Sequence, residues 1–175
     1  MSRVTSVELD EEDAKYIEDL IREGRIRSLK EFVEKCVKFG KKYTLDRWQP
    51  GVFNVGPVRM VIIPKRVLES LISKLSEKDY EAVGREMGEI LRSLFFLYYR
   101  MTPEENPELA LKAMSENGIG EFILDDDGFI KVFHSVFPSK LVKAYLETAL
   151  NVELEDIELK IDVQMFKVIE WNKEF

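Results

Sequence analysis

A single strand-like segment near the start of the chain constrains its fold more than any other feature. From Arg3 to Leu9, successive side chains alternate between two faces, as they do in a half-covered β-strand. One face holds Thr5, Val7 and Leu9, and the other holds Val4, Ser6 and Glu8. No other strand-like run occurs before residue 58, and a strand without a neighbour leaves its backbone N–H and C=O groups unpaired. The segment therefore needs a partner that its own neighbourhood does not supply.

Two short amphipathic helices follow this segment. Asp10 is a suitable N-cap for the first helix, and Gly24 is a suitable end for it. Ser28 and Glu31 have the spacing of a capping box, which predicts the start of the second helix, and Gly40 predicts its end. We expect the covered sides to hold Ala14, Ile17, Leu20 and Ile21 in the first helix and Leu29, Phe32, Val33, Cys36, Val37 and Phe39 in the second.

The order of strand, helix, Gly-containing turn and Ser-capped helix within about forty residues resembles the ribbon-helix-helix family of DNA-binding proteins. This resemblance implies a homodimer whose two strands form an antiparallel ribbon in the major groove of double-stranded DNA. In the family pattern, Val4, Ser6 and Glu8 point to the DNA, whereas a register shifted by one residue presents Arg3, Thr5 and Val7 instead. The candidate base-reading residues are Arg3, Thr5, Ser6 and Glu8.

The start of the second helix is the candidate phosphate anchor. Its first backbone amides have no acceptor within the helix and lie at the positive end of the helix dipole. The candidate phosphate-contacting residues are Arg25, Arg27, Ser28, Leu29 and Lys30. Glu8 departs from the family pattern, because a carboxylate there repels phosphates even though it is able to accept from a cytosine amino group.

The rest of the chain predicts an α+β fold. We expect a ribbon-helix-helix module over residues 1–44, a linker over 45–56 and a second domain over 57–175. The elements expected in the second domain are a strand over 58–63, a helix that opens at Pro64, a long core helix over 80–101, a helix over 107–116, a hairpin over 121–133 that turns at Asp125–Gly128, a helix over 139–150, and strands around 152–163 and 166–171. The order after residue 80 resembles the ligand-binding domains of TRAPP subunits and four-vinyl-reductase-like proteins, in architecture alone.

Eight bulky apolar residues within residues 90–99 exceed what one face of a helix requires. Some of them must contact a ligand, a partner chain or a second layer of the fold, and core packing accounts for the others. The candidate ligand-pocket residues are Phe95, Tyr98, Tyr99 and His134. For His134 the alternative is a structural role, which a lone histidine more often has.

Composition excludes several other functions. Cys36 is the only cysteine and His134 the only histidine, so an internal disulfide and a zinc site built from these residue types are both excluded. We find no nucleophile with a base, no glycine-rich phosphate loop and no metal cluster, and we therefore expect neither an enzyme nor a cofactor. No apolar run approaches about 18 residues, so we expect a cytoplasmic protein without a membrane segment.

The charge distribution separates the two parts of the chain. The net charge is −7, but residues 1–43 hold ten basic and ten acidic side chains, so that all the excess acid follows Tyr43. A neutral module before an acidic domain favours a sequence-specific transcriptional repressor whose second domain senses a small-molecule effector or assembles dimers. Two alternatives remain open: an antitoxin-like or scaffold protein that binds a partner through residues 57–175, and an N-terminal part that belongs to one larger α+β domain.

Overall fold

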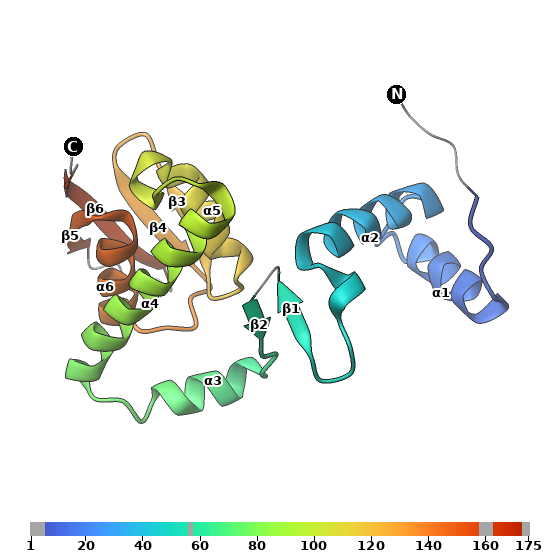
Figure 1. The fold of residues 1–175 in the computed structure, drawn as a ribbon, viewed down its shortest axis with the longest axis horizontal. Helices are drawn as coiled ribbons and strands as arrows, with labels where there is room; N and C mark the ends of the chain where they lie inside the picture. The colour runs from blue at the N-terminus through green and yellow to red at the C-terminus, as the bar shows by residue number, and fades with distance from the viewer. Residues whose placement is uncertain (1–5, 56–57, 158–162, 173–175) are drawn as a thin grey trace. The chain divides into compact units, whose positions relative to one another are not determined.

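A computed structural model describes residues 6–55, 58–157 and 163–172 of the chain. The chain divides into two compact units, Met1–Ile62 and Ile63–Phe175, which are described separately (Figure 1). The described residues form six α-helices and two antiparallel sheets, which confirms the predicted α+β class. Within the described part of the chain, no helix has the length and apolar character needed to cross a membrane.

The N-terminal unit begins with the two predicted helices, α1 (Glu11–Arg22) and α2 (Leu29–Tyr43). The Asp10 carboxylate accepts a hydrogen bond from the backbone N–H of Asp13 at 2.8 Å, which confirms the predicted N-cap. Gly24 has a φ of +71°, and this left-handed backbone turns the chain away from α1. The sequence therefore predicted α1 at both of its ends.

The predicted end of α2 at Gly40 is wrong, because the helix continues to Tyr43 and ends at Thr44, whose φ is +48°. Two side chains beyond the helix hold this end. The Thr44 hydroxyl donates to the carbonyl of Asn54 at 2.8 Å. The Trp48 indole N–H donates to the carbonyls of both Tyr43 and Asn54, at 2.9 and 2.8 Å. The helix end is therefore set by residues that the local pattern does not include.

The segment expected to be a linker carries secondary structure of its own. A 3₁₀ helix (Leu45–Arg47) follows α2, and a short strand, β1 (Phe53–Val55), pairs antiparallel with β2 (Val58–Met60). The strand predicted over 58–63 is therefore shorter than expected, since β1 offers it only three pairing residues. This hairpin belongs to the N-terminal unit.

The C-terminal unit contains the remaining helices and the larger sheet. Its elements are α3 (Lys65–Ile72), α4 (Glu77–Tyr99), a 3₁₀ helix (Pro103–Glu105), α5 (Pro107–Glu116), β3 (Glu121–Leu124), β4 (Phe129–Phe133), α6 (Ser139–Leu150), β5 (Val152–Ile157) and β6 (Val163–Trp171). The bounds of α5, β3, β4 and α6 are those predicted. The long helix α4 begins three residues earlier than predicted, because Ser76 and Asp79 form a capping box there.

Four strands form the sheet in the order β3-β4-β6-β5, and every pair is antiparallel. The Asp125 carboxylate closes the predicted turn between β3 and β4 by accepting from the N–H groups of Asp127 and Phe129. The inner face of the sheet buries Ile130, Val132 and Phe166. Helix α6 covers this core on one side and packs along α4 on the other (Figure 1).

Two glycines allow α4 and α6 to approach each other closely. A Cβ atom at Gly84 would collide with the carbonyl oxygen of Leu141 and lie 2.9 Å from the Cβ of Ala144. A Cβ atom at Gly88 would lie 2.6 Å from the Cβ of Thr148. Both glycines are buried one turn apart on the same face of α4. The contact between these helices therefore requires the absence of side chains at both positions, which the sequence analysis missed.

We expect Gly84→Ala to lower the free energy of unfolding by about 1–3 kcal/mol, because the new methyl group must displace the backbone of α6. The loss should appear even though alanine is intrinsically the better helix former by about 1 kcal/mol. Urea denaturation of the full chain measures the change. Gly40→Ala is the matched control, because its Cβ would meet only the Leu45 side chain at 3.8 Å. Equal stability of Gly84→Ala and the native chain would contradict this packing.

Candidate nucleic-acid interface

The predicted base-reading segment lies at the N-terminal edge of the described residues. Arg3 and Thr5 are outside the described part of the chain. Ser6 and Glu8 are described and exposed, and residues 6–10 form no strand within a single copy of the chain. A strand is defined by its hydrogen bonds to a neighbour, so one copy has no means of forming the ribbon. Val7 is 59% exposed, although the resemblance places it in the core of a dimer.

The start of α2 is fixed by two side-chain hydrogen bonds. The Ser28 hydroxyl accepts from the backbone N–H of Glu31 at 3.2 Å, which confirms Ser28 as the N-cap. The Glu31 carboxylate accepts from the N–H of Arg27 at 2.8 Å, and not from that of Ser28 as a standard capping box requires. The cap thus reaches one residue further back than predicted and also orders the turn before the helix.

Glu31 is also held by Lys35, whose ammonium nitrogen lies 2.8 Å from the carboxylate. The hydrogen bond from Lys35 lowers the pKa of Glu31 below its ordinary value of 4.5, and the N–H of Arg27 lowers it further. At neutral pH this carboxylate is therefore ionised and committed to the helix start. Its hydrogen-bond partners are the Arg27 N–H and Lys35, so the carboxylate does not occupy the backbone N–H groups of Leu29 and Lys30.

The candidate phosphate anchor is open to solvent. The backbone N–H groups of Leu29 and Lys30 have no acceptor among the described residues, and both residues are exposed. The Lys30 ammonium lies 3.7 Å from Glu34, and the Arg25 guanidinium lies 3.5 Å from Glu23, both as exposed pairs. Such pairs contribute little, so their cations remain available to a phosphate. The Arg27 guanidinium forms no ion pair with a carboxylate in the described ranges.

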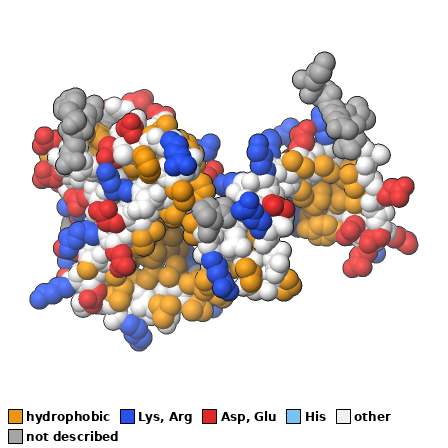
Figure 2. Space-filling model, viewed as in Figure 1, with side chains coloured by type: hydrophobic (Ala, Val, Ile, Leu, Met, Phe, Trp, Pro, Cys, Tyr) orange, Lys and Arg blue, Asp and Glu red, His pale blue; other side chains and the backbone are white. Residues whose placement is uncertain are grey.

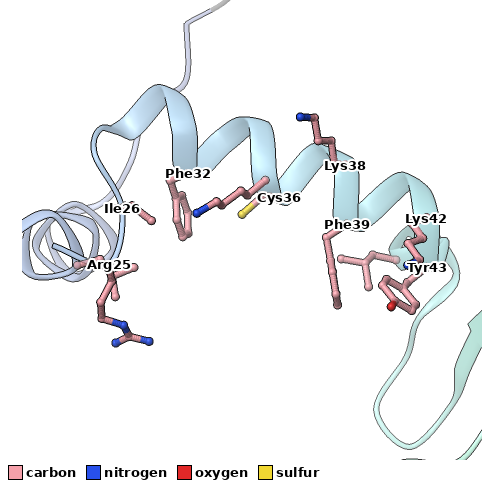
Figure 3. Close-up of a pocket in the computed structure, with 11 residues that line it drawn as sticks. Arg25, Ile26, Phe32, Cys36, Lys38, Phe39, Lys42 and Tyr43 are labelled. Atoms are coloured by element: carbon pink, nitrogen blue, oxygen red, sulfur yellow. The ribbon is translucent and has the colours of Figure 1, made fainter. Parts of the chain in front are cut away.

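An apolar groove of about 680 Å³ lies along α2 and the end of α1. Phe32, Cys36, Phe39 and Tyr43 follow one another along its wall, and the aromatic rings point to the same side of α2 while Lys38 points away (Figure 3). Phe39 is 51% exposed. Hydrophobic side chains are visible on the surface between these two helices, with acidic side chains at the outer end of α1 (Figure 2).

The expectation that α2 has a buried side is therefore wrong for a single copy of the chain. Among the described residues of the N-terminal unit, the buried hydrophobic ones are Ile17, Leu20 and Ile26, and α2 contributes none. Of the six residues expected on its covered side, Phe32 and Val33 are half-buried, whereas Leu29, Cys36, Val37 and Phe39 are exposed. Ile21 of α1 is exposed as well. The described part of this unit holds no further element that covers these side chains.

The four candidate ligand-pocket residues lie in different surroundings. Phe95 is buried in the core of the C-terminal unit and packs against the ring of Tyr99, with centroids 4.6 Å apart. Tyr98 and Tyr99 lie at the end of α4 and are 43% and 39% exposed. The burial of the rest of the Tyr98 side chain and the neighbouring Tyr99 raise the pKa of Tyr98. His134 follows β4 on the surface with a φ of +54°.

In the described ranges, no three His, Cys, Asp or Glu side chains are arranged to hold a metal ion. Comparison of the chain with protein-family models, curated proteins and solved structures gives no match.

The hydrogen bonds to Glu31 predict a pH dependence of stability. Because the pKa of Glu31 in the folded protein is lower than in the unfolded chain, its contribution is fully present above pH 4.5 and is lost as the pH falls through the folded pKa. Glu31→Gln retains an acceptor for the Arg27 N–H without a titrating charge. We expect the native chain to lose more stability than Glu31→Gln between neutral pH and about pH 3, as measured by thermal unfolding. Parallel losses in the two proteins would contradict this assignment.

Proposed function

We propose that this protein is a dimeric, sequence-specific DNA-binding transcriptional regulator of the ribbon-helix-helix type. The uncovered apolar face of α1 and α2 is the observation that carries the proposal. Large side chains exposed in one copy, such as Phe39 and Val37, gain free energy when a second copy covers them. A helix pair with this face unpaired suits a module whose folded form is a dimer.

Dimerisation would also supply the missing partner for the N-terminal segment. Two copies related by a two-fold axis bring identical segments together antiparallel, so residues 3–9 of each copy pair with those of the other. The resulting ribbon presents alternate side chains to the major groove of double-stranded DNA. Arg3, Thr5, Ser6 and Glu8 are the candidates for base contacts in one register or the other.

The start of α2 is proposed to position the protein on the DNA backbone. The amides of Leu29 and Lys30 form a phosphate site at the helix N-terminus, and Ser28 shapes it as the N-cap. Arg25, Arg27 and Lys30 add positive charge around these amides. Because residues 1–43 carry no net charge, this local arrangement, and not a general basic surface, must supply the affinity.

The C-terminal unit would then sense an effector or assemble dimers. An effector regulates DNA binding only if it binds differently to the DNA-competent and DNA-incompetent arrangements of the dimer. We propose repression as the output and the cytoplasm as the location.

The double substitution Arg27→Ala with Lys30→Ala tests the phosphate anchor. We expect weaker binding to all duplex sequences and a shallower dependence of log Kd on log salt, by about one unit for each phosphate that the variant no longer binds. Mobility shifts across a salt series, on a site selected from random duplexes, measure both quantities. Lys38→Ala with Lys41→Ala removes the same charge from the other half of α2 and should change the slope less. Equal slopes for the two double variants would rule out the anchor.

Single substitutions in the ribbon distinguish the two registers. If Ser6 faces the bases, Ser6→Ala should reduce the preference for one base at one position of the selected DNA by about 1–3 kcal/mol. Thr5→Ala should instead weaken the dimer. In the shifted register, the two effects exchange. Selection from random DNA measures the sequence preference of each variant, and sedimentation measures how strongly it dimerises. No change in selected sequence for either variant would exclude this segment as the reader.

A further inference from the structure

Helix α4 carries a second apolar face that the described chain leaves uncovered. Its buried face holds Gly84, Gly88, Leu91 and Phe95. Another stripe runs along α4 through Ile90, Leu94 and Leu97, which are spaced four and three residues apart and so lie on one side of the helix. Ile90 is 52% exposed, Leu97 is 42% exposed and Leu94 is half-buried. A stripe with this spacing is the usual contact surface between two helices.

Opposite charges border the two ends of this α4 stripe. Glu86 lies one turn before Ile90, and Arg100, the C-cap residue that follows α4, lies three residues after Leu97. Both side chains are exposed, and neither has an ion-pair partner among the residues that the structure describes. When two such helices cross antiparallel about Leu94, the acidic end of one meets the basic end of the other. The charge pattern therefore matches the same stripe on a second copy.

We propose that the α4 stripe is a second self-association surface, on which α4 of another copy packs antiparallel around a two-fold axis near Leu94. The inference rests on the proposed function in one respect: dimers of the helix pair α1–α2 hold two C-terminal units on short tethers. Tethering raises the effective concentration of the second copy to about the millimolar range. Where the tethers allow the two stripes to meet, the linked copy occupies the stripe before an unlinked partner.

A two-by-two set of substitutions in the full chain tests the surface. Phe39→Glu places a charge in the α1–α2 groove, and Leu97→Glu places one in the α4 stripe. Both positions are exposed in a single copy, so both variants should fold, and circular dichroism checks that they do. Sedimentation then gives the mass of the native chain, the two single variants and the double variant. We expect both single variants to remain associated and the double variant to be a monomer.

Each of the other possible results shows which of the two proposed surfaces is wrong. A Phe39→Glu protein that stays monomeric at about millimolar chain concentration, which matches the effective concentration that tethering supplies, would overturn the α4 surface. A monomeric Leu97→Glu protein would support the α4 surface and overturn dimerisation through α1–α2, and with it the proposed function. A double variant that stays associated, or a native chain that is a monomer, would overturn the α4 proposal. Phe96→Glu is the matched control, because Phe96 is 53% exposed but lies about 100° around the helix from Leu97.

The charged ends provide an independent readout of the antiparallel arrangement. In the Phe39→Glu background, Arg100→Glu should weaken association, and adding Glu86→Arg should restore it by returning an opposite pair to each end. Restoration would support the two-fold arrangement. Weakening without restoration would overturn it, and the stripe would then be open to a partner of another sequence.

Discussion

The close approach of α4 and α6 is the contact on which the rest of the C-terminal unit depends. Gly84 and Gly88 lie directly against the backbone of α6, so these two helices share one face that has no room for side chains. Helix α6 is in turn buried on the sheet through Leu141, Val142 and Leu146, which are fully covered. The position of α4 therefore follows from that of α6, and its orientation follows from the glycines. A helix held by one narrow face must present its remaining apolar side chains elsewhere.

The N-terminal unit lacks a comparable internal contact among its described residues. Its helices are ordered by local hydrogen bonds, from Asp10 and Ser28 at their starts and from Thr44 and Trp48 at the far end of α2. These bonds define where each helix begins and ends, but they bury little apolar surface. In the described part of the unit, three hydrophobic residues are buried, whereas α2 leaves a wide apolar face in solvent. Hydrogen bonds thus fix where the helices of this unit begin and end, but much of the apolar surface of α2 is not buried.

Local chemistry explains which elements the sequence predicted well. The Asp125–Gly128 turn and the helix bounded by Pro107 and Glu116 depend on neighbours in the chain, and their bounds are correct. The end of α2 was missed because Trp48 and Asn54 determine it across ten residues. The glycine contact was missed because its partner, α6, lies more than fifty residues away. For the candidate interface, the N-cap at Ser28 was predictable, whereas its extension to Arg27 and the exposure of α2 required the structure.

Symmetry determines how many chains assemble when one chain carries two self-association surfaces. An isologous contact has its own two-fold axis, and a dimer has only one such axis. If the α1–α2 groove and the α4 stripe are filled by the same second copy, their axes coincide and assembly stops at two chains. If they are filled by different copies, each dimer presents two free stripes and assembly continues to a tetramer or beyond. The choice decides how many DNA half-sites one particle holds, because each helix-pair dimer carries one ribbon. The mass of the native chain in solution therefore reports directly on the architecture of the operator.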